Sequence, residues 1–136
     1  MQVVYTLYMK DISHLTEQEI QVTQHGGTEA PFQNEYWDNS EKGGYRCKVC
    51  NTLLFASDAK IDSSKGPVGL RGWPAFENAL PGVLVFKDDM KLGYKRTEVL
   101  CAKCDAHLGH LFDDEETTTG KHYCINSCSL DFEKGE

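Results

Sequence analysis

The sequence predicts a mainly β domain with a short helical arm at its N-terminus, and three observations predict it. From Tyr45 onward, apolar residues come in short runs separated by Gly, Pro, Asn and Asp, which is typical of short strands joined by turns. Helix signals occur only before that point. The 136 residues, 40% of them hydrophobic and 26% charged, match one globular domain. We expect a single domain over 1–136, with a helical arm over about 8–27 and a β core over about 44–133.

The arm contains the signals of one short helix. Thr16 and Glu19 have the spacing of a capping box, in which each side chain accepts a hydrogen bond from the other residue's backbone. Gly26 and Gly27 end the helix.

The remaining elements follow in order. Residues 28–44 are rich in turn-forming types and predict an irregular segment, from which Tyr36 and Trp37 fold back onto the core. Glycine-rich residues 62–72 predict a loop, and residues 113–120 an acidic turn. The candidate strands are 45–47, 52–55, 83–87, 96–101 and 121–132.

Composition excludes several classes of function. Fourteen Lys and Arg against 21 Asp and Glu give a formal net charge of −7, which opposes binding to a phosphate backbone. No apolar run reaches the roughly 18–20 residues of a membrane span. The start of the chain lacks the basic region and long apolar core of an export signal. We expect a cytoplasmic monomer that binds neither nucleic acid nor membrane.

Four of the six cysteines form two C-x-x-C pairs: Cys47 with Cys50, and Cys101 with Cys104. Two such knuckles can supply four thiolates to a tetrahedral Zn²⁺ ion. Because four protein ligands leave no position for water, the predicted zinc site is structural.

Three other uses of these residues stay open. A disulfide framework requires an oxidising compartment. A redox dithiol usually has one C-x-x-C near a βαβ pattern rather than two knuckles. His107 and His110, which follow the second knuckle, offer an alternative ligand set. If zinc is held by thiolates alone, both imidazoles are free for other chemistry.

A separate group of residues indicates a nucleophilic thiol. Cys124 lies in the last predicted strand, where a cysteine is most often a small buried apolar residue. However, the chain also contains His107, His110 and His122, which can supply or accept protons. Trp73 on a glycine-rich loop can form an apolar pocket. Since a thiolate beside imidazoles is a recurring catalytic arrangement, Cys124 is the candidate nucleophile.

Cys128 follows Cys124 by four residues. In one extended strand their Cα atoms would be roughly 13 Å apart, whereas a disulfide requires less than about 7 Å. A direct bond therefore needs a bulge, a turn or local unfolding. Cys128 is either a packed small residue or a resolving thiol.

Six segments, in this order, resemble the B-type peptide-methionine (R)-S-oxide reductases: GTEAPFQNEYWD, YRCKVCNTLLF, KIDSS, GWPAF, RTEVLCAKCDAHLGHLFDD and HYCINSCSLDF. The resemblance runs over about residues 8–133. It implies that family's β-tent, made of antiparallel sheets with the zinc knuckles at one end. It also implies that the four knuckle cysteines bind zinc.

The resemblance implies a reaction as well. Cys124 matches the nucleophile of the YCINS motif. Asn126, His107 and His110 match polar active-site residues, and Trp73 matches the indole that receives the substrate's methyl group. The substrate would be free or protein-bound methionine-R-sulfoxide, and the electrons would come from thioredoxin or another thiol. The role would be repair of oxidative damage through a sulfenic acid on Cys124.

The chemistry requires a nucleophile at the sulfoxide sulfur and a proton at its oxygen. A free thiol has a pKa of ~8.5, so Cys124 needs neighbours that favour its anion. Asn126 would share a strand face with Cys124 and could donate a hydrogen bond to the thiolate or the substrate. We expect protonated His107 or His110 to give the proton to the oxygen.

Two positions depart from the family pattern. A resolving cysteine often precedes GWP, but Arg71 stands there, after an apparent insertion around residues 65–70. We therefore expect an external thiol to reduce Cys124, with Cys128 as the alternative. An arginine commonly stands two residues before the nucleophile, where this chain has His122, which we assign to substrate binding.

Two other functions would explain part of the sequence. A non-catalytic zinc-ribbon-like module that docks a protein would explain the knuckles but not the residues around Cys124. A zinc hydrolase would need an open coordination position, which four cysteines oppose.

Overall fold

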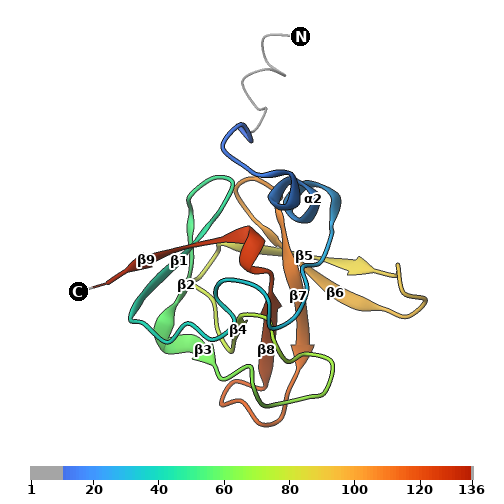
Figure 1. Ribbon diagram of the computed structural model, residues 1–136. Helices are drawn as coiled ribbons and strands as arrows, with labels where there is room; N and C mark the ends of the chain where they lie inside the picture. Colours follow the sequence, from blue (N-terminus) through green and yellow to red (C-terminus); the bar gives the residue numbers. More distant parts are fainter. Residues whose placement is uncertain (1–10, 136) are drawn as a thin grey trace.

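Two antiparallel sheets form the framework of residues 11–135, the part of the chain that the computed structural model describes (Figure 1). One sheet has the strand order β2-β1-β9, and the other has the order β3-β4-β8-β7-β6-β5. The predicted mainly β class is confirmed. The first part of the predicted helical arm and the sequence checked for an export signal lie outside the described residues.

The strands, in chain order, are β1 (Gly43–Cys47), β2 (Leu53–Ala56), β3 (Lys60–Ile61), β4 (Ala75–Phe76), β5 (Leu84–Asp89), β6 (Arg96–Cys101), β7 (His107–Asp113), β8 (Lys121–Ile125) and β9 (Leu130–Lys134). Two short 3₁₀ turns, η1 (Ser57–Ala59) and η2 (Ser127–Ser129), precede β3 and β9.

The helix α2 (Glu17–His25) forms as its capping signals predict. The Thr16 hydroxyl accepts from the backbone N–H of Glu19 at 3.2 Å, and the Glu19 carboxylate accepts from the Thr16 N–H at 2.9 Å. The helix ends at Gly26, whose φ of 71° is left-handed and suits glycine. The helix packs against β7 and η2, so it covers one end of the larger sheet (Figure 1).

One predicted strand is wrong in extent. Residues 121–132 do not form a single strand, because the chain leaves the larger sheet after Ile125, makes the turn η2 and enters the smaller sheet as β9. At the break, the Asn126 backbone and side-chain N–H groups both donate to the Leu108 carbonyl oxygen, at 2.9 and 3.2 Å. The short strands β3 and β4 and the strand β7 were not predicted.

The two faces of the six-stranded sheet differ in chemistry. Side chains of antiparallel partners point to the same side. Val99, Leu111, Tyr123 and Ile125 point into the apolar core, where Phe55 and Phe76 stack with ring centroids 4.3 Å apart. The opposite face is polar: it carries Asp89, Arg96, Glu98, His107, His110, His122 and Cys124.

A bulge in β7 places two histidines on that polar face. Val99 pairs with Gly109 and Leu100 with His107, so Leu108 is an extra residue in β7. In a regular strand, residues three apart point to opposite faces. Because of the extra residue, the rings of His107 and His110 lie on the same side with centroids 5.4 Å apart.

Within residues 11–135, no helix combines the length and apolar character needed to cross a membrane.

Candidate active site and four-cysteine cluster

The two knuckles have the same local geometry. Cys47 ends β1 and Cys101 ends β6, and in each knuckle the residue four positions on donates its N–H back to the cysteine carbonyl at 2.8 Å. These residues are Asn51 and Asp105, which have φ of 68° and 65°. Asn and Asp tolerate this left-handed conformation, which lets each turn aim both of its sulfurs to one side.

The knuckles meet at one point. The Sγ atoms of Cys47, Cys50, Cys101 and Cys104 all lie within 4.8 Å of one another. The Cys47–Cys104 and Cys50–Cys101 Sγ distances are both 3.6 Å. A tetrahedral ion with Zn–S bonds of ~2.3 Å needs sulfurs about 3.8 Å apart. The cluster therefore has the size for such an ion, and it joins the two sheets through β1 and β6.

Sulfur atoms this close perturb one another's protonation. Hydrogen bonds with Cys101 raise the pKa of both Cys47 and Cys104. The same kind of hydrogen bond, from Cys104 and then Cys47, lowers the pKa of Cys101. Four thiolates in this space need a cation to offset their repulsion, so the donor set fits a metal site.

A separate pocket opens on the polar face of the larger sheet. It brings together four of the predicted site residues, which come from different elements: Trp73, His110, Cys124 and Asn126. The other lining residues are Thr28, Gly69, Leu70, Arg96, Gly109, Phe112 and Ile125.

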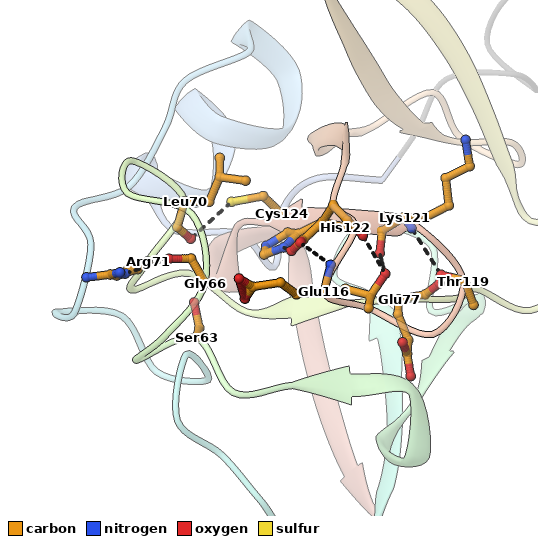
Figure 2. A network of polar contacts seen from close by, with 12 residues as sticks. Ser63, Gly66, Leu70, Arg71, Glu77, Glu116, Thr119, Lys121, His122 and Cys124 are labelled. Atoms are coloured by element: carbon orange, nitrogen blue, oxygen red, sulfur yellow. Dashed lines mark hydrogen bonds and ion pairs between the residues drawn. The ribbon is translucent and has the colours of Figure 1, made fainter.

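Cys124 occupies the middle of this arrangement. Its β8 position pairs with His110 on one side and with Ala75 on the other. The thiol points toward the Leu70 carbonyl oxygen at 3.9 Å, on the loop before Trp73 (Figure 2). Burial, and then the nearby charge of Glu29, raise the pKa of the Cys124 thiol to about 12. The resting group is therefore a neutral thiol, and the predicted neighbours that favour its anion do not outweigh the effect of burial.

Gly109 lies next to this strand pair for a steric reason. A Cβ atom at position 109 would collide with the carbonyl oxygen of Cys124. Only glycine lets β7 and β8 approach at this point.

His110 is held by a carboxylate. Its Nε2 lies 2.7 Å from Asp89 Oδ2, which also accepts from Arg96 Nη2 at 3.1 Å. Hydrogen bonds, first from the Lys91 N–H and then from His110, lower the pKa of Asp89 to about 2. Because the ionised carboxylate can only accept, the Nε2 of His110 carries a hydrogen. Burial lowers the pKa of His110, so its Nδ1 is an unprotonated acceptor at neutral pH.

The other two histidines do not line the pocket. His107 is buried, and its Nδ1 lies 2.7 Å from Glu98 Oε2. His122 is also buried, with its Nδ1 3.0 Å from Asp114 Oδ2 on the acidic turn. Burial lowers the pKa of His107. Neither ring therefore reaches the pocket lining, although both lie on the same face of the sheet as His110 and Cys124.

Trp73 and Asn126 are both hydrogen-bonded to Glu29, a residue that was not predicted from the sequence. The indole Nε1–H of Trp73 donates to the Glu29 carbonyl oxygen at 3.0 Å. The amide oxygen of Asn126 accepts from the Glu29 N–H at 3.1 Å. Glu29 belongs to the GTEAPF segment, and the resemblance of this segment to the reductase family is the sequence feature that could have identified it. Arg96 was missed as well, and only the strand register places it beside the pocket.

Neither Arg71 nor Cys128 lines the pocket that contains the Cys124 thiol. The Arg71 guanidinium is exposed and donates through Nε to the Gly66 carbonyl oxygen at 2.9 Å, so it points outward from the loop (Figure 2). Cys128 is in η2 and lines a different, polar pocket together with Glu29.

Fold and site together define a small antiparallel β protein with two kinds of sulfur site: a closed cluster of four thiols, and a lone thiol in a pocket with an imidazole and an indole. Comparison with known proteins gives this class a family. The SelR domain family model matches residues 15–134. The chain belongs to this family, the B-type peptide methionine sulfoxide reductases, which are oxidoreductases.

Similarity to relatives extends over most of the chain. It is 52% identical over 120 residues to the peptide methionine sulfoxide reductase MsrB of Herminiimonas arsenicoxydans, covering 88% of this chain and 83% of that protein. It is 43% identical over 129 residues to MsrB of Pasteurella multocida, covering 94% and 95%. It is 46% identical over 119 residues to the mitochondrial methionine-R-sulfoxide reductase B3 of Mus musculus, covering 87% of this chain and 45% of that protein.

Proposed function

We propose that this chain reduces methionine-R-sulfoxide, free or in proteins, to methionine with electrons from thioredoxin or another thiol. The observation that carries the proposal is the pocket in which Cys124, His110 and Trp73 converge on the polar face of the larger sheet. We propose that a single domain over residues 1–136 carries out this reduction. We also propose that the reaction repairs oxidative damage to methionine.

The substrate's S-methyl group would lie against the Trp73 indole. The ring forms an apolar wall and is held in place through its Nε1–H. Excluding water around the methyl group strengthens the polar contacts at the sulfoxide. Asn126 contributes to the same wall, and its amide orients the backbone of this segment.

In the first half-reaction, the sulfoxide oxygen is transferred to Cys124, and the thiol proton is transferred to that oxygen through His110. The Cys124 sulfur attacks the sulfoxide sulfur while His110 Nδ1 takes the thiol proton. His110 then gives this proton to the sulfoxide oxygen as the oxygen passes to Cys124. The products are methionine and a Cys124 sulfenic acid, so the thiol proton ends on the transferred oxygen. Asp89 holds the imidazole in the tautomer that this step requires. His107, whose ring centroid lies 5.4 Å from that of His110 and which does not line the pocket, keeps a supporting role.

The second half-reaction requires another thiol. Because Arg71 stands at the position where a resolving cysteine often occurs, we propose that an external thiolate attacks the sulfenic acid and releases water. A mixed disulfide forms, and a second thiol then reduces it. Cys128 is the alternative resolver, although its pocket differs from that of Cys124.

We propose that the four-cysteine cluster holds a structural zinc ion, remote from the reaction. The sulfur spacing supports this, since both short contacts of 3.6 Å lie close to the tetrahedral edge. When bound, the ion joins two distant hairpins and leaves no open coordination position. Reduced thiolates in the cluster favour the cytoplasm as the compartment, and we propose a monomer without nucleic-acid or membrane partners.

Activity against separated epimers tests the function. The R and S sulfoxides of a methionine peptide are supplied with thioredoxin or dithiothreitol in parallel. We expect turnover of the R epimer only, with both reductants. Consumption of neither epimer, or of the S epimer alone, would contradict the proposal.

Mass spectrometry tests the route of reduction. Enzyme treated with R-sulfoxide without reductant and then with dimedone should carry one adduct, on Cys124. An intact Cys124–Cys128 disulfide would instead identify Cys128 as the resolver.

A further inference from the structure

Glu29 is a buried acid that the proposed reaction does not use. Glu29 is only 5% exposed, and it directly follows Thr28, which lines the pocket. Within residues 11–135, none of the ion pairs involves this carboxylate. An unpaired buried charge is costly, so its hydrogen bonds must offset the loss of water.

The carboxylate holds the turn that follows the nucleophile. Oε2 accepts from the Ser127 N–H at 2.5 Å, and Oε1 accepts from the Cys128 N–H at 2.8 Å. These N–H groups open η2, where the chain leaves β8 for the smaller sheet. Burial raises the pKa of Glu29, while these hydrogen bonds act in the opposite direction.

The main chain of the same residue holds two walls of the pocket. Its N–H donates to the Asn126 amide oxygen, and its carbonyl oxygen accepts from the Trp73 indole. One residue therefore connects three segments: the loop before β4, the end of β8 and the turn η2. A shift of its backbone would move the indole and the amide together.

We propose that Glu29 is the positioning residue of this site: its carboxylate anchors η2 so that its main chain sets the places of the Trp73 indole and the Asn126 amide. The inference rests on the proposed function, because it assigns to Trp73 the substrate's methyl group. Glu29 itself acts through these groups and does not contact the substrate.

Its charge adds a second effect. The carboxylate lies near the Cys124 thiol and, after burial, is the other cause of that group's raised pKa. Removing the charge without changing the shape should therefore make the thiol ionise at lower pH.

Two variants and one control test the proposal. Glu29→Ala removes both acceptors, and Glu29→Gln removes the charge but keeps a similar shape. Glu35→Gln removes a charge from an exposed residue lining the neighbouring pocket. Trp73 emission is followed in a Trp37→Phe background, because Trp37 packs against Phe32 outside the pocket.

For Glu29→Ala we expect the KM for methionine-R-sulfoxide to rise about tenfold to a hundredfold, with a red shift of the Trp73 emission. Glu29→Gln should show a smaller rise in KM and faster alkylation of Cys124 at pH 8. Glu35→Gln should match the wild type in all three measurements. If Glu29→Ala does not fold, Glu29→Gln carries the test.

Folded Glu29 variants with wild-type KM, Trp73 emission and Cys124 alkylation would overturn the proposal, even if their Tm were lower. Failure of the proposed function looks different. In that case the wild type would not reduce the sulfoxide, while emission and alkylation would still report on Glu29.

Discussion

The four sulfurs of the cluster lie within 4.8 Å of one another, whereas no other thiol lines the pocket around Cys124. In the cluster each sulfur is positioned by a short turn that recurs, with the same 2.8 Å hydrogen bond, in both knuckles. Cys124 is positioned by strand register, and its surroundings come from five separate segments. The cluster joins the two sheets, while the pocket lies on one face of the larger sheet.

This difference indicates that the cluster contributes to stability and that the pocket carries out the reaction. The cluster is suited to hold a cation tightly, because its thiols repel one another when ionised. The pocket holds one neutral thiol, that of Cys124, beside the unprotonated imidazole nitrogen of His110. Changes at the two sites should therefore affect different measurements, and four experiments test this separation.

The largest expected effect is on turnover. Cys124→Ser should reduce kcat/KM by more than about 10⁴-fold, because a hydroxyl is a far weaker nucleophile toward the sulfoxide sulfur. Metal content and Tm should stay at wild-type values. A serine variant that still reduced the sulfoxide would disprove the assignment of the nucleophile.

The next effect is on folding. Cys101→Ser should abolish metal binding and either prevent folding or lower the Tm by more than about 10 °C, because the cation couples two hairpins. Cys128→Ser is the matched control, since this cysteine lies outside the cluster, and it should keep its metal. Retention of metal and stability in Cys101→Ser would show that the cluster is not a structural site.

A smaller effect should appear in substrate affinity. Trp73→Ala should raise the KM for the sulfoxide about tenfold or more, because the apolar wall for the methyl group is lost. Metal content should not change. Trp37→Ala serves as the control outside the pocket, and an equal rise in KM in both variants would argue against a specific role for Trp73.

The smallest effect is a pH profile. Since burial and Glu29 raise the pKa of Cys124 to about 12, its alkylation rate should increase about tenfold per pH unit from pH 7 to pH 10. Only the thiolate reacts, and its fraction grows with pH below the pKa. Metal-bound knuckle cysteines should remain unmodified over this range. A plateau below pH 8 would show that a neighbour stabilises the Cys124 anion in the free enzyme.

The sequence predicted features that depend on a few neighbouring residues. The capping box of α2 is of this kind, and so is the irregular segment predicted over residues 28–44, which ends two residues earlier because β1 begins at Gly43. The prediction that Tyr36 packs onto the core is confirmed, because its ring lies 5.8 Å from that of Tyr45. The same prediction for Trp37 is wrong: its ring packs edge-on against Phe32 and is not part of the core cluster.

Features that depend on distant segments were harder to predict. The strand β7 contains His, Gly and Asp, which are weak strand formers, and it forms because it is paired on both sides. The split of residues 121–132 between two sheets follows from hydrogen bonds of Asn126 to Leu108, eighteen positions away. The role of Glu29 needs the fold, because its hydrogen-bond partners stand 44 to 99 positions along the chain.

The extra residue in β7 has a consequence for how this strand tolerates change. The odd-numbered positions Gly109 and Leu111 are on the core side of β7, yet odd-numbered His107 faces the opposite side. Straightening the strand would exchange His107 and Leu108, sending an imidazole into the apolar interior. Deleting Leu108 would leave both imidazoles on their side and cost one core leucine. The inward–outward alternation of side chains is thus interrupted once in this strand, at Leu108, and this interruption keeps the imidazole rings of His107 and His110 together.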